Sequence, residues 1–192
     1  MDYIEIKNWL KENLSKDRYI HSISVAEFSK KIAKIHGYDS DKAYLAGLLH
    51  DCARDFKVEE LKNYAISCKI KIDEVEQFHP ILLHAPVSAC IAKEKFGVTD
   101  NEILQAIASH TVLNKSPKIL DKILYVADLA EPKREFPEAK PIRDEALRDL
   151  DKAVILAIDL TFFYLINEKR LIHPVTLSAR NLLIREVYYG KN

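Results

Sequence analysis

The sequence is poor in residues that interrupt helices or cross-link chains. It has only 4 Gly and 7 Pro among 192 residues, so tight turns are few and long helices are expected. Its three cysteines are Cys52, Cys68 and Cys90, and no two of them form a CxxC pair. An odd number of cysteines argues against a disulfide framework and favours a reducing compartment.

The chain also lacks an excess of either charge. Lys+Arg and Asp+Glu each number 29, and no basic stripe is present, which argues against a protein that grips nucleic acid. The amino-terminal stretch "MDYIEIKNWLKENL" carries charges throughout and does not resemble a signal peptide. The longest apolar-rich stretch, "AVILAIDLTFFYLI", is interrupted by Asp159 and is too short to span a membrane. We therefore expect a soluble, cytoplasmic protein with no membrane partner.

Apolar residues recur at helical spacing along most of the chain. His21, Val25, Phe28, Ile32 and Ile35 follow one another at steps of four and three residues, so they share one helix face that we expect to be buried. Gly37 suits the carboxyl-terminal cap of that helix. Similar spacing predicts helices over 6–14, from Ser40 through the stretch 44–56, 58–68, from near Pro86 to 96, 102–110, from 116–117 to 128, 144–168 and 176–188.

Local signals refine this reading. Ser40 suits a helix amino-terminal cap, and Thr99 with Glu102 reads as a capping box. The stretch "AEPKREFPEAKPIRD", residues 130–144, holds three of the prolines and is expected to be a loop. No alternating strand pattern persists over a useful length. The sequence predicts one all-α domain, a helical bundle over residues 1–192.

Several histidines and aspartates interrupt the apolar faces of these helices. A buried carboxylate without a partner is costly, and a buried histidine needs partners at both ring nitrogens. Any one of them alone would read more readily as a satisfied core residue than as a ligand. Their recurrence on several faces favours a shared cation instead. The predicted metal ligands are His21, His50, Asp51, His84, His110 and Asp128.

The order of these residues resembles the HD-domain superfamily of metal-dependent phosphohydrolases. Its hallmark is a first His, an adjacent His-Asp pair and a later Asp, which match His21, His50-Asp51 and Asp128. His84 and His110 match the intervening histidines of subfamilies that hold a second metal. The resemblance implies an all-helical metal-dependent enzyme.

A narrower resemblance covers nearly the whole chain. The stretches "RYIHSISVAEFSKKIA", "AGLLHDCARDF", "HAPVSA", "ASHTV", "ILYVADLAEPKREFP" and "IHPVTLSARN" are similar to the YqeK family of HD proteins. The resemblance implies symmetrical hydrolysis of diadenosine tetraphosphate to two ADP, with bound iron. It also implies that the partner is a nucleotide.

The donor set agrees with a metal but does not select one. Nitrogen and oxygen donors without thiolate suit iron, manganese, cobalt or zinc. The number of ions per site, one or two, also remains open. Asp51 lies at the centre of the set and is the natural bridge between two ions. We predict Asp51, His84 and His110 as the catalytic residues. Cys52 lies further round the helix and is not expected to be a ligand.

Cleavage of a polyphosphate also needs positive charge around the phosphates. Arg54 follows the His-Asp pair by one turn, and Lys133 and Arg134 follow Asp128 in the loop. The start of the last helix offers backbone N–H groups that favour anions. The predicted substrate contacts are His21, Arg54, His84, His110, Thr111, Lys133, Arg134, His173, Pro174, Thr176 and Arg180.

Two other functions remain open at this point. The same metal set would serve a nucleoside monophosphate phosphatase or a cyclic-nucleotide phosphodiesterase. A non-enzymatic helical regulatory module is the second alternative, although a structural metal site needs no further cations around it. The oligomeric state, including a homodimer, is not fixed by the sequence.

Overall fold

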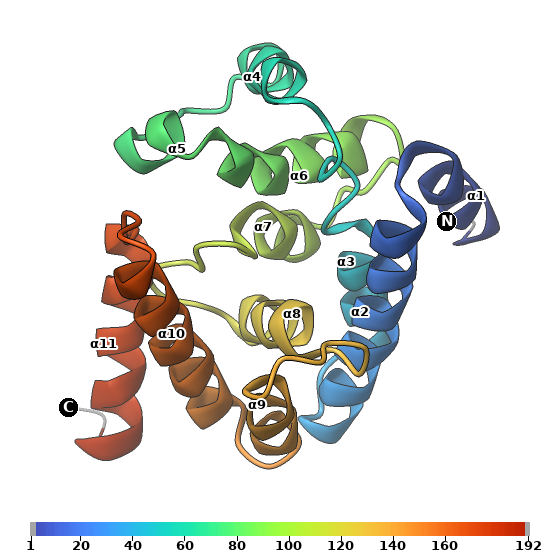
Figure 1. Cartoon of the computed structure of the whole chain (residues 1–192). Coiled ribbons are helices and arrows are strands. Elements are labelled where there is room, and N and C mark those ends of the chain that lie inside the picture. The colour runs from blue at the N-terminus through green and yellow to red at the C-terminus, as the bar shows by residue number, and fades with distance from the viewer. Residues whose placement is uncertain (1–2, 191–192) are drawn as a thin grey trace.

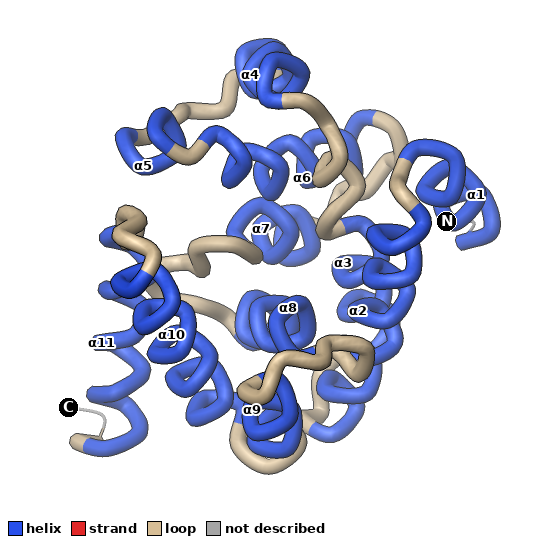
Figure 2. The backbone as a smooth tube through the Cα atoms, in the orientation of Figure 1, coloured by secondary structure: helices blue, strands red, loops and turns tan. Residues whose placement is uncertain are grey.

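The computed structural model describes residues 3–190, and every regular element in that range is helical (Figure 2). This confirms the predicted all-α class. None of these helices is long and apolar enough to cross a lipid bilayer. The helices are α1 (Tyr3–Asn13), α2 (Lys16–Ile35), α3 (Ser40–Leu49), α4 (Val58–Ser67), α5 (Glu74–Phe78), the short 3-10 helix η1 (Pro80–Leu83), α6 (His84–Glu94), α7 (Asn101–Ser109), α8 (Ile119–Ala130), α9 (Ala139–Ala146), α10 (Leu150–Asn167) and α11 (Pro174–Tyr188).

Helix α8 lies at the centre of the molecule, with α7 beside it (Figure 1). It packs against α2 and α3 on one side and against α9 and α10 on the other. The layer of α4, α5, η1 and α6 covers α7, while α11 packs outside α10. The apolar face of α8 is fully buried at Leu120, Ile123 and Leu124, as expected for a central helix. Helices on three sides of α8 can therefore direct side chains to one place.

The closest helix pair, α2 and α3, depends on a glycine. A Cβ atom added at Gly47 would lie 2.7 Å from the Cα atom of Ala26 and 2.9 Å from its backbone nitrogen. No larger residue fits without moving one helix away from the other. Gly47 therefore holds the end of α3, where His50 and Asp51 follow, close to His21 on α2.

Several predicted boundaries were wrong. The predicted helix over 144–168 is two helices, and α9 begins inside the expected loop. They separate because Asp149 has an extended backbone and its side chain accepts a hydrogen bond from the Lys152 N–H (3.1 Å), which starts α10. Helix α3 ends at Leu49 instead of continuing through residue 56, because residues 50–55 form turns. Helix α8 begins at Ile119, α6 at His84, and α5 with η1 was not predicted.

Two caps and one buried position also differ from expectation. Asp39, and not Ser40, caps α3 by accepting bonds from the N–H groups of residues 41 and 42. Asp100, and not Thr99, caps α7. In each case an aspartate beside the predicted cap makes the bond instead. Ile35 was expected on a buried face but is 48% exposed, because it lies in the last turn of α2. Gly37 has the left-handed backbone that was predicted, with φ of 66°.

The cysteines correct a second expectation. Cys68 and Cys90 form a disulfide between the end of α4 and the middle of α6, with Cα atoms 6.3 Å apart. The odd cysteine count gave no information on whether two of the three meet in space. Cys52 is the free thiol, buried with its Sγ 3.6 Å from the Ser88 carbonyl. It is not among the residues that converge on the site described below.

Candidate metal centre

Six histidine and aspartate side chains converge between α2, α3, α6, α7 and α8. The structure brings together every residue that the sequence predicts as a metal ligand. Five of them are buried, and the Asp128 side chain is 24% exposed. They are His21 on α2, His50 and Asp51 directly after α3, His84 at the start of α6, His110 directly after α7 and Asp128 on α8.

The six residues form two groups that share one carboxylate. His21, His50, Asp51 and Asp128 make the first group, and Asp51, His84 and His110 make the second. In the first group, Oδ2 of Asp51 lies 3.4 Å from His50 Nε2. In the second, Oδ1 of Asp51 lies 3.0 Å from His84 Nε2 and 3.5 Å from His110 Nε2. The two oxygens of Asp51 thus face different groups, which is the arrangement of a bridging ligand.

The helix ends fix the orientation of three imidazole rings. Nδ1 of His50 donates to the Gly47 carbonyl (2.7 Å), and Nδ1 of His110 donates to the Ile107 carbonyl (2.8 Å). Nδ1 of His84 donates likewise to the Ile81 carbonyl (2.5 Å). The carbonyls in the last turn of a helix lack a helical partner, so a histidine placed just after the helix can satisfy one. Each ring then directs Nε2 into the site.

A buried and unpaired nitrogen shows that this donor set suits a cation. Nε2 of His50 makes no hydrogen bond, although the side chain is fully buried. Its neighbours are carboxylates of Asp51 and Asp128 at 3.4 Å and 3.6 Å, together with the imidazole rings of His21 and His110. A metal ion would bind the lone pairs of these rings and carboxylates together, once it replaces the proton that His50 carries in the metal-free chain.

The pKa values follow from burial and from the clustered charges. Burial raises the pKa of Asp51 and Asp128, but the attraction and hydrogen bonds of the histidines hold both well below the usual range. Burial lowers the pKa of His110, so this ring is neutral. Burial also lowers the pKa of His50, but Asp51 and Asp128 raise it to about 10 in the metal-free chain. The metal-free site therefore holds the ionised carboxylates of Asp51 and Asp128. It also holds a proton on His50 that a bound cation must displace.

Glu131 is a buried carboxylate beside the site that the sequence reading missed. Its Oε1 accepts a hydrogen bond from Nδ1 of His21 (3.2 Å), and its Oε2 accepts from the Ser24 hydroxyl and from the Lys133 backbone N–H (2.6 Å). Burial raises the pKa of Glu131, but the bonds from His21 and Ser24 lower it below its usual value. Glu131 therefore orients His21 as the backbone carbonyls orient the other rings. The sequence signal for this role was the position of Glu131 three residues after the predicted ligand Asp128.

Three arginines line a cavity of about 350 Å³ that opens onto the centre, which we call the metal cavity. Arg18, also missed, lies one turn before His21, and its Nη1 is 2.6 Å from Oδ2 of Asp51. Arg134 donates from Nη2 to Oδ1 of Asp128 (3.3 Å) and from Nε to the Asp128 carbonyl (3.2 Å). Arg54 lines the same cavity, as predicted for a residue near the phosphates.

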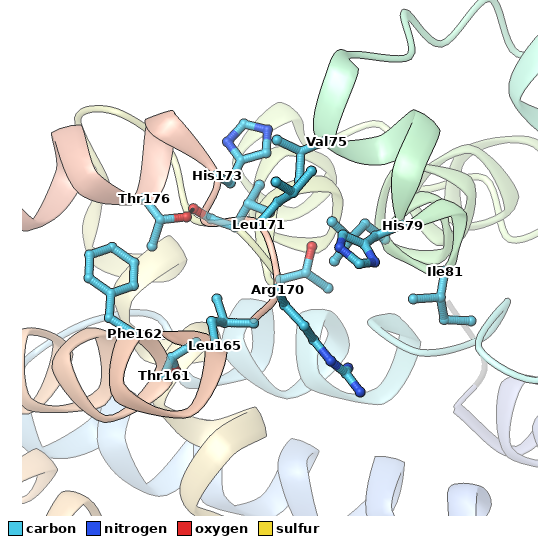
Figure 3. A pocket seen from close by; sticks show the side chains of 13 residues that line it. Val75, His79, Ile81, Thr161, Phe162, Leu165, Arg170, Leu171, His173 and Thr176 are labelled. Carbon is cyan, nitrogen blue, oxygen red and sulfur yellow. Dashed lines mark hydrogen bonds between the residues drawn. The ribbon is translucent and has the colours of Figure 1, made fainter. Parts of the chain in front are cut away.

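The other predicted substrate contacts lie in different parts of the structure. Thr111 lines both the metal cavity and an adjoining cavity of about 170 Å³, which we call the His173 cavity. His173 and Thr176 line the His173 cavity (Figure 3), where His173 Nε2 lies 2.5 Å from Asp73 Oδ2 and Thr176 donates to the Val112 carbonyl (2.6 Å). Pro174 is exposed in the first turn of α11.

Two predicted contacts are not brought to the site. Lys133 is exposed and meets the centre only through its backbone N–H, which bonds Glu131. Arg180 pairs with Asp159 through Nε and through Nη2 (3.2 Å) and lines neither the metal cavity nor the His173 cavity. Both residues are positively charged, but Arg180 on α11 faces Asp159 on α10 instead of the metal cavity.

The chain matches known proteins over most of its length. The model of the HD domain matches residues 18–133, which include all six converging residues. A protein of Halalkalibacterium halodurans named "Bis(5'-nucleosyl)-tetraphosphatase, symmetrical" is 35% identical over 177 residues, covering 92% of this chain and 94% of the relative. The Bacillus subtilis protein of the same name is 35% identical over 175 residues, covering 91% and 94%.

A solved structure gives the same result for the fold. The crystal structure of a predicted HD superfamily hydrolase involved in NAD metabolism from Clostridium acetobutylicum superposes with a TM-score of 0.93 at 33% identity. The match covers 97% of this chain and 98% of the other. The chain therefore belongs to the HD-domain family and, within it, to the YqeK family that its motifs resemble.

Proposed function

We propose that this protein is a metal-dependent hydrolase that cuts diadenosine tetraphosphate symmetrically into two ADP. The observation that carries the proposal is the pair of ligand groups sharing Asp51 at the floor of a cavity lined by Arg18, Arg54 and Arg134. The two relatives named above carry the name of this activity. One water molecule is consumed across the bond between the second and third phosphates, and each half leaves as ADP.

The residues suited to hold the metal are the six that converge. His21, His50, Asp51 and Asp128 would hold one ion, and Asp51, His84 and His110 would hold a second if two are bound. When bound, a di- or trivalent cation at this site supplies a Lewis acid for a phosphoryl oxygen and acidifies water. The ionised Asp51 and neutral His110 are already in the protonation states that a metal requires.

The chain's own cations offset the charge of the polyphosphate. Arg134 and Arg18 each contact a ligand carboxylate, so their guanidinium groups lie at the edge of the metal cavity and face its interior. Arg54 adds a third positive group to the lining of the same cavity. Planar guanidinium groups bind phosphate oxygens in pairs and stabilise the charge that develops as the anhydride opens. We assign these three arginines to the tetraphosphate.

One nucleoside of the substrate fits the His173 cavity. This cavity adjoins the metal cavity through Ile81, Leu82, Thr111 and Thr161, and its walls are mainly apolar. His173 and Thr176 supply polar atoms at its mouth, and Arg170 extends along one side (Figure 3). A base bound here would place its ribose and first phosphates toward the arginines.

Four finer expectations from the sequence belong to the same proposal. We propose iron as the metal, a cytoplasmic location, one domain over residues 1–192 and a homodimer. The oxygen and nitrogen donors of the site are compatible with iron and do not require it. Metal analysis of the protein purified without added metal, together with light scattering, tests the first and last of these.

Product analysis tests the proposed reaction. Metal-loaded protein is incubated with diadenosine tetraphosphate, and the early products are separated by ion-exchange chromatography. ADP alone is the expected result. AMP with ATP would mean an asymmetric cut and would contradict the proposal. Absence of hydrolysis with metal bound would move the assignment to the monophosphatase alternative.

A further inference from the structure

A third cavity lies beside the metal cavity, and nothing in the proposal above uses it. It measures about 690 Å³ and shares Leu129 and Thr161 with the metal cavity. Its other walls come from the loop after α8, at Phe136, and from α10, at Phe163 and Tyr164. We call it the Phe163 cavity. It adjoins the metal cavity, where we expect the phosphates to bind.

The His173 cavity and the Phe163 cavity meet at Thr161 and Leu165 of α10 and extend from there along different sides of this helix. Phe162 lines the first, whereas the next two residues, Phe163 and Tyr164, line the second. Thr161 lines both of these cavities and the metal cavity as well. The charged metal cavity is therefore flanked by two mainly apolar cavities, one on each side of the helix that carries Thr161.

The walls of the Phe163 cavity are exposed aromatic rings. Phe163 is 66% exposed, Tyr164 is 52% exposed and Phe136 is 37% exposed. Such rings are the surfaces on which nucleobases stack. Asn167 and Glu138 border the same cavity and offer an amide and a carboxylate, which can bond to the amino group and ring nitrogens of a base.

We propose that the Phe163 cavity binds the second adenosine of the dinucleoside tetraphosphate. This inference rests on the proposed function. The substrate has an apolar base at each end and four phosphates between them, and the three adjoining cavities have the same order of properties. Because the cut is symmetrical, the second ADP also needs a place from which to leave. The exposed rings of the Phe163 cavity suit the half that leaves, and the His173 cavity would then hold the other half.

The experiment compares a substrate that has two bases with one that has a single base. Phe163→Ala and wild type are assayed with diadenosine tetraphosphate and with adenosine 5'-tetraphosphate, which would be cut by one water into ADP and pyrophosphate. The matched control is Ile166→Ala, which removes an exposed side chain (60%) from the same helix outside the Phe163 cavity. If adenosine tetraphosphate is cut too slowly, its inhibition constant against the dinucleotide replaces KM.

For the dinucleotide, Phe163→Ala should raise KM by about fivefold or more. Fivefold is about the smallest loss of affinity expected when an aromatic ring stacked on a base is replaced by alanine. For adenosine tetraphosphate, KM should change little, because its single base can use the His173 cavity. Ile166→Ala should leave both constants unchanged. Equal changes for both substrates, or no change for either, would overturn the inference.

Two further outcomes are distinguishable from these. A wild-type protein that does not cut the dinucleotide would contradict the proposed function itself, before any variant is compared. A loss in Phe163→Ala that accompanies conversion of a dimer to a monomer, measured by light scattering, would assign the exposed rings to a second copy of the chain. That result would also overturn the inference.

Discussion

At the scale of single residues, His50 shows how a buried side chain can keep one ring nitrogen available to a cation. Its Nδ1 is bonded to a carbonyl of its own helix, and its Nε2 has no hydrogen-bond partner. Burial lowers the pKa of this ring, but Asp51 and Asp128 raise it to about 10 without metal. Between its unfolded value of about 6.5 and that pKa, the metal-free protein therefore carries a proton that a metal must replace.

Metal binding should therefore release about one proton near neutral pH. Titration calorimetry with Mn²⁺ at pH 7.5, in two buffers of different ionisation enthalpy, measures the number released. The apparent affinity should also weaken as the pH falls, since more protons then compete for His50. An observed enthalpy that is independent of the buffer would contradict the assignment of His50 as a protonated ligand.

Glu131 gives a second residue-scale prediction. Glu131→Gln keeps the shape of the side chain but removes the negative charge that faces His21. Loss of a carboxylate that orients a ligating histidine commonly weakens metal affinity by about 10- to 100-fold. Glu135→Gln, an exposed change in the same loop, is the matched control and should leave the affinity unchanged. Equal affinities for both variants would show that Glu131 does not orient the ligand.

At the scale of helices, the site depends on the close approach of α2 and α3. Gly47→Ala adds a Cβ atom against the backbone of Ala26. Alanine improves helix propensity by about 1 kcal/mol, but overpacking against a backbone costs about 1–3 kcal/mol. The clash should outweigh the gain in propensity, because a backbone atom cannot move aside as a side chain can.

Gly47→Ala should therefore lower the free energy of unfolding, measured by urea denaturation. It should also weaken metal binding, since His50 and Asp51 follow the end of α3. A variant as stable as wild type, with full metal affinity, would show that the two helices separate without cost.

Helix periodicity predicted the site better than it predicted the helix ends. His21, His84, His110 and Asp128 could be placed together because each is in phase with buried apolar residues on its own helix. Arg18 and Glu131 were missed because their roles depend on contacts between helices. Arg18 reaches from α2 to Asp51 after α3, and Glu131 reaches from the end of α8 to His21 on α2. Cap residues failed for another reason: an aspartate one residue away competes for the same backbone N–H groups. The Cys68–Cys90 pair required knowledge of how α4 packs on α6.

At the scale of the whole molecule, the centre gathers side chains from several packed helices. The ligands come from α2, α6, α8 and the segments directly after α3 and α7. One or two cations would therefore link these parts of the chain. A ligand that binds only the folded state adds about 2.7 kcal/mol when its free concentration is 100 times its dissociation constant. Removing the metal also leaves carboxylates and imidazoles without their shared partner.

Chelation should accordingly lower the melting temperature by several degrees, measured by calorimetry before and after dialysis against a chelator. Returning the metal should restore the original value, which separates metal loss from irreversible damage. A melting temperature indifferent to confirmed metal loss would contradict a centre built from buried ligands.

The central claim is that the residues sharing Asp51 hold the metal that makes this protein a hydrolase. Metal content and hydrolysis of diadenosine tetraphosphate, measured in the same preparations of wild type and Asp51→Asn, test it most directly. Asp51→Asn keeps the side-chain shape and removes the bridging charge. We predict that metal content falls and that ADP production is lost together with it. Full metal content with full ADP production in Asp51→Asn would contradict the account.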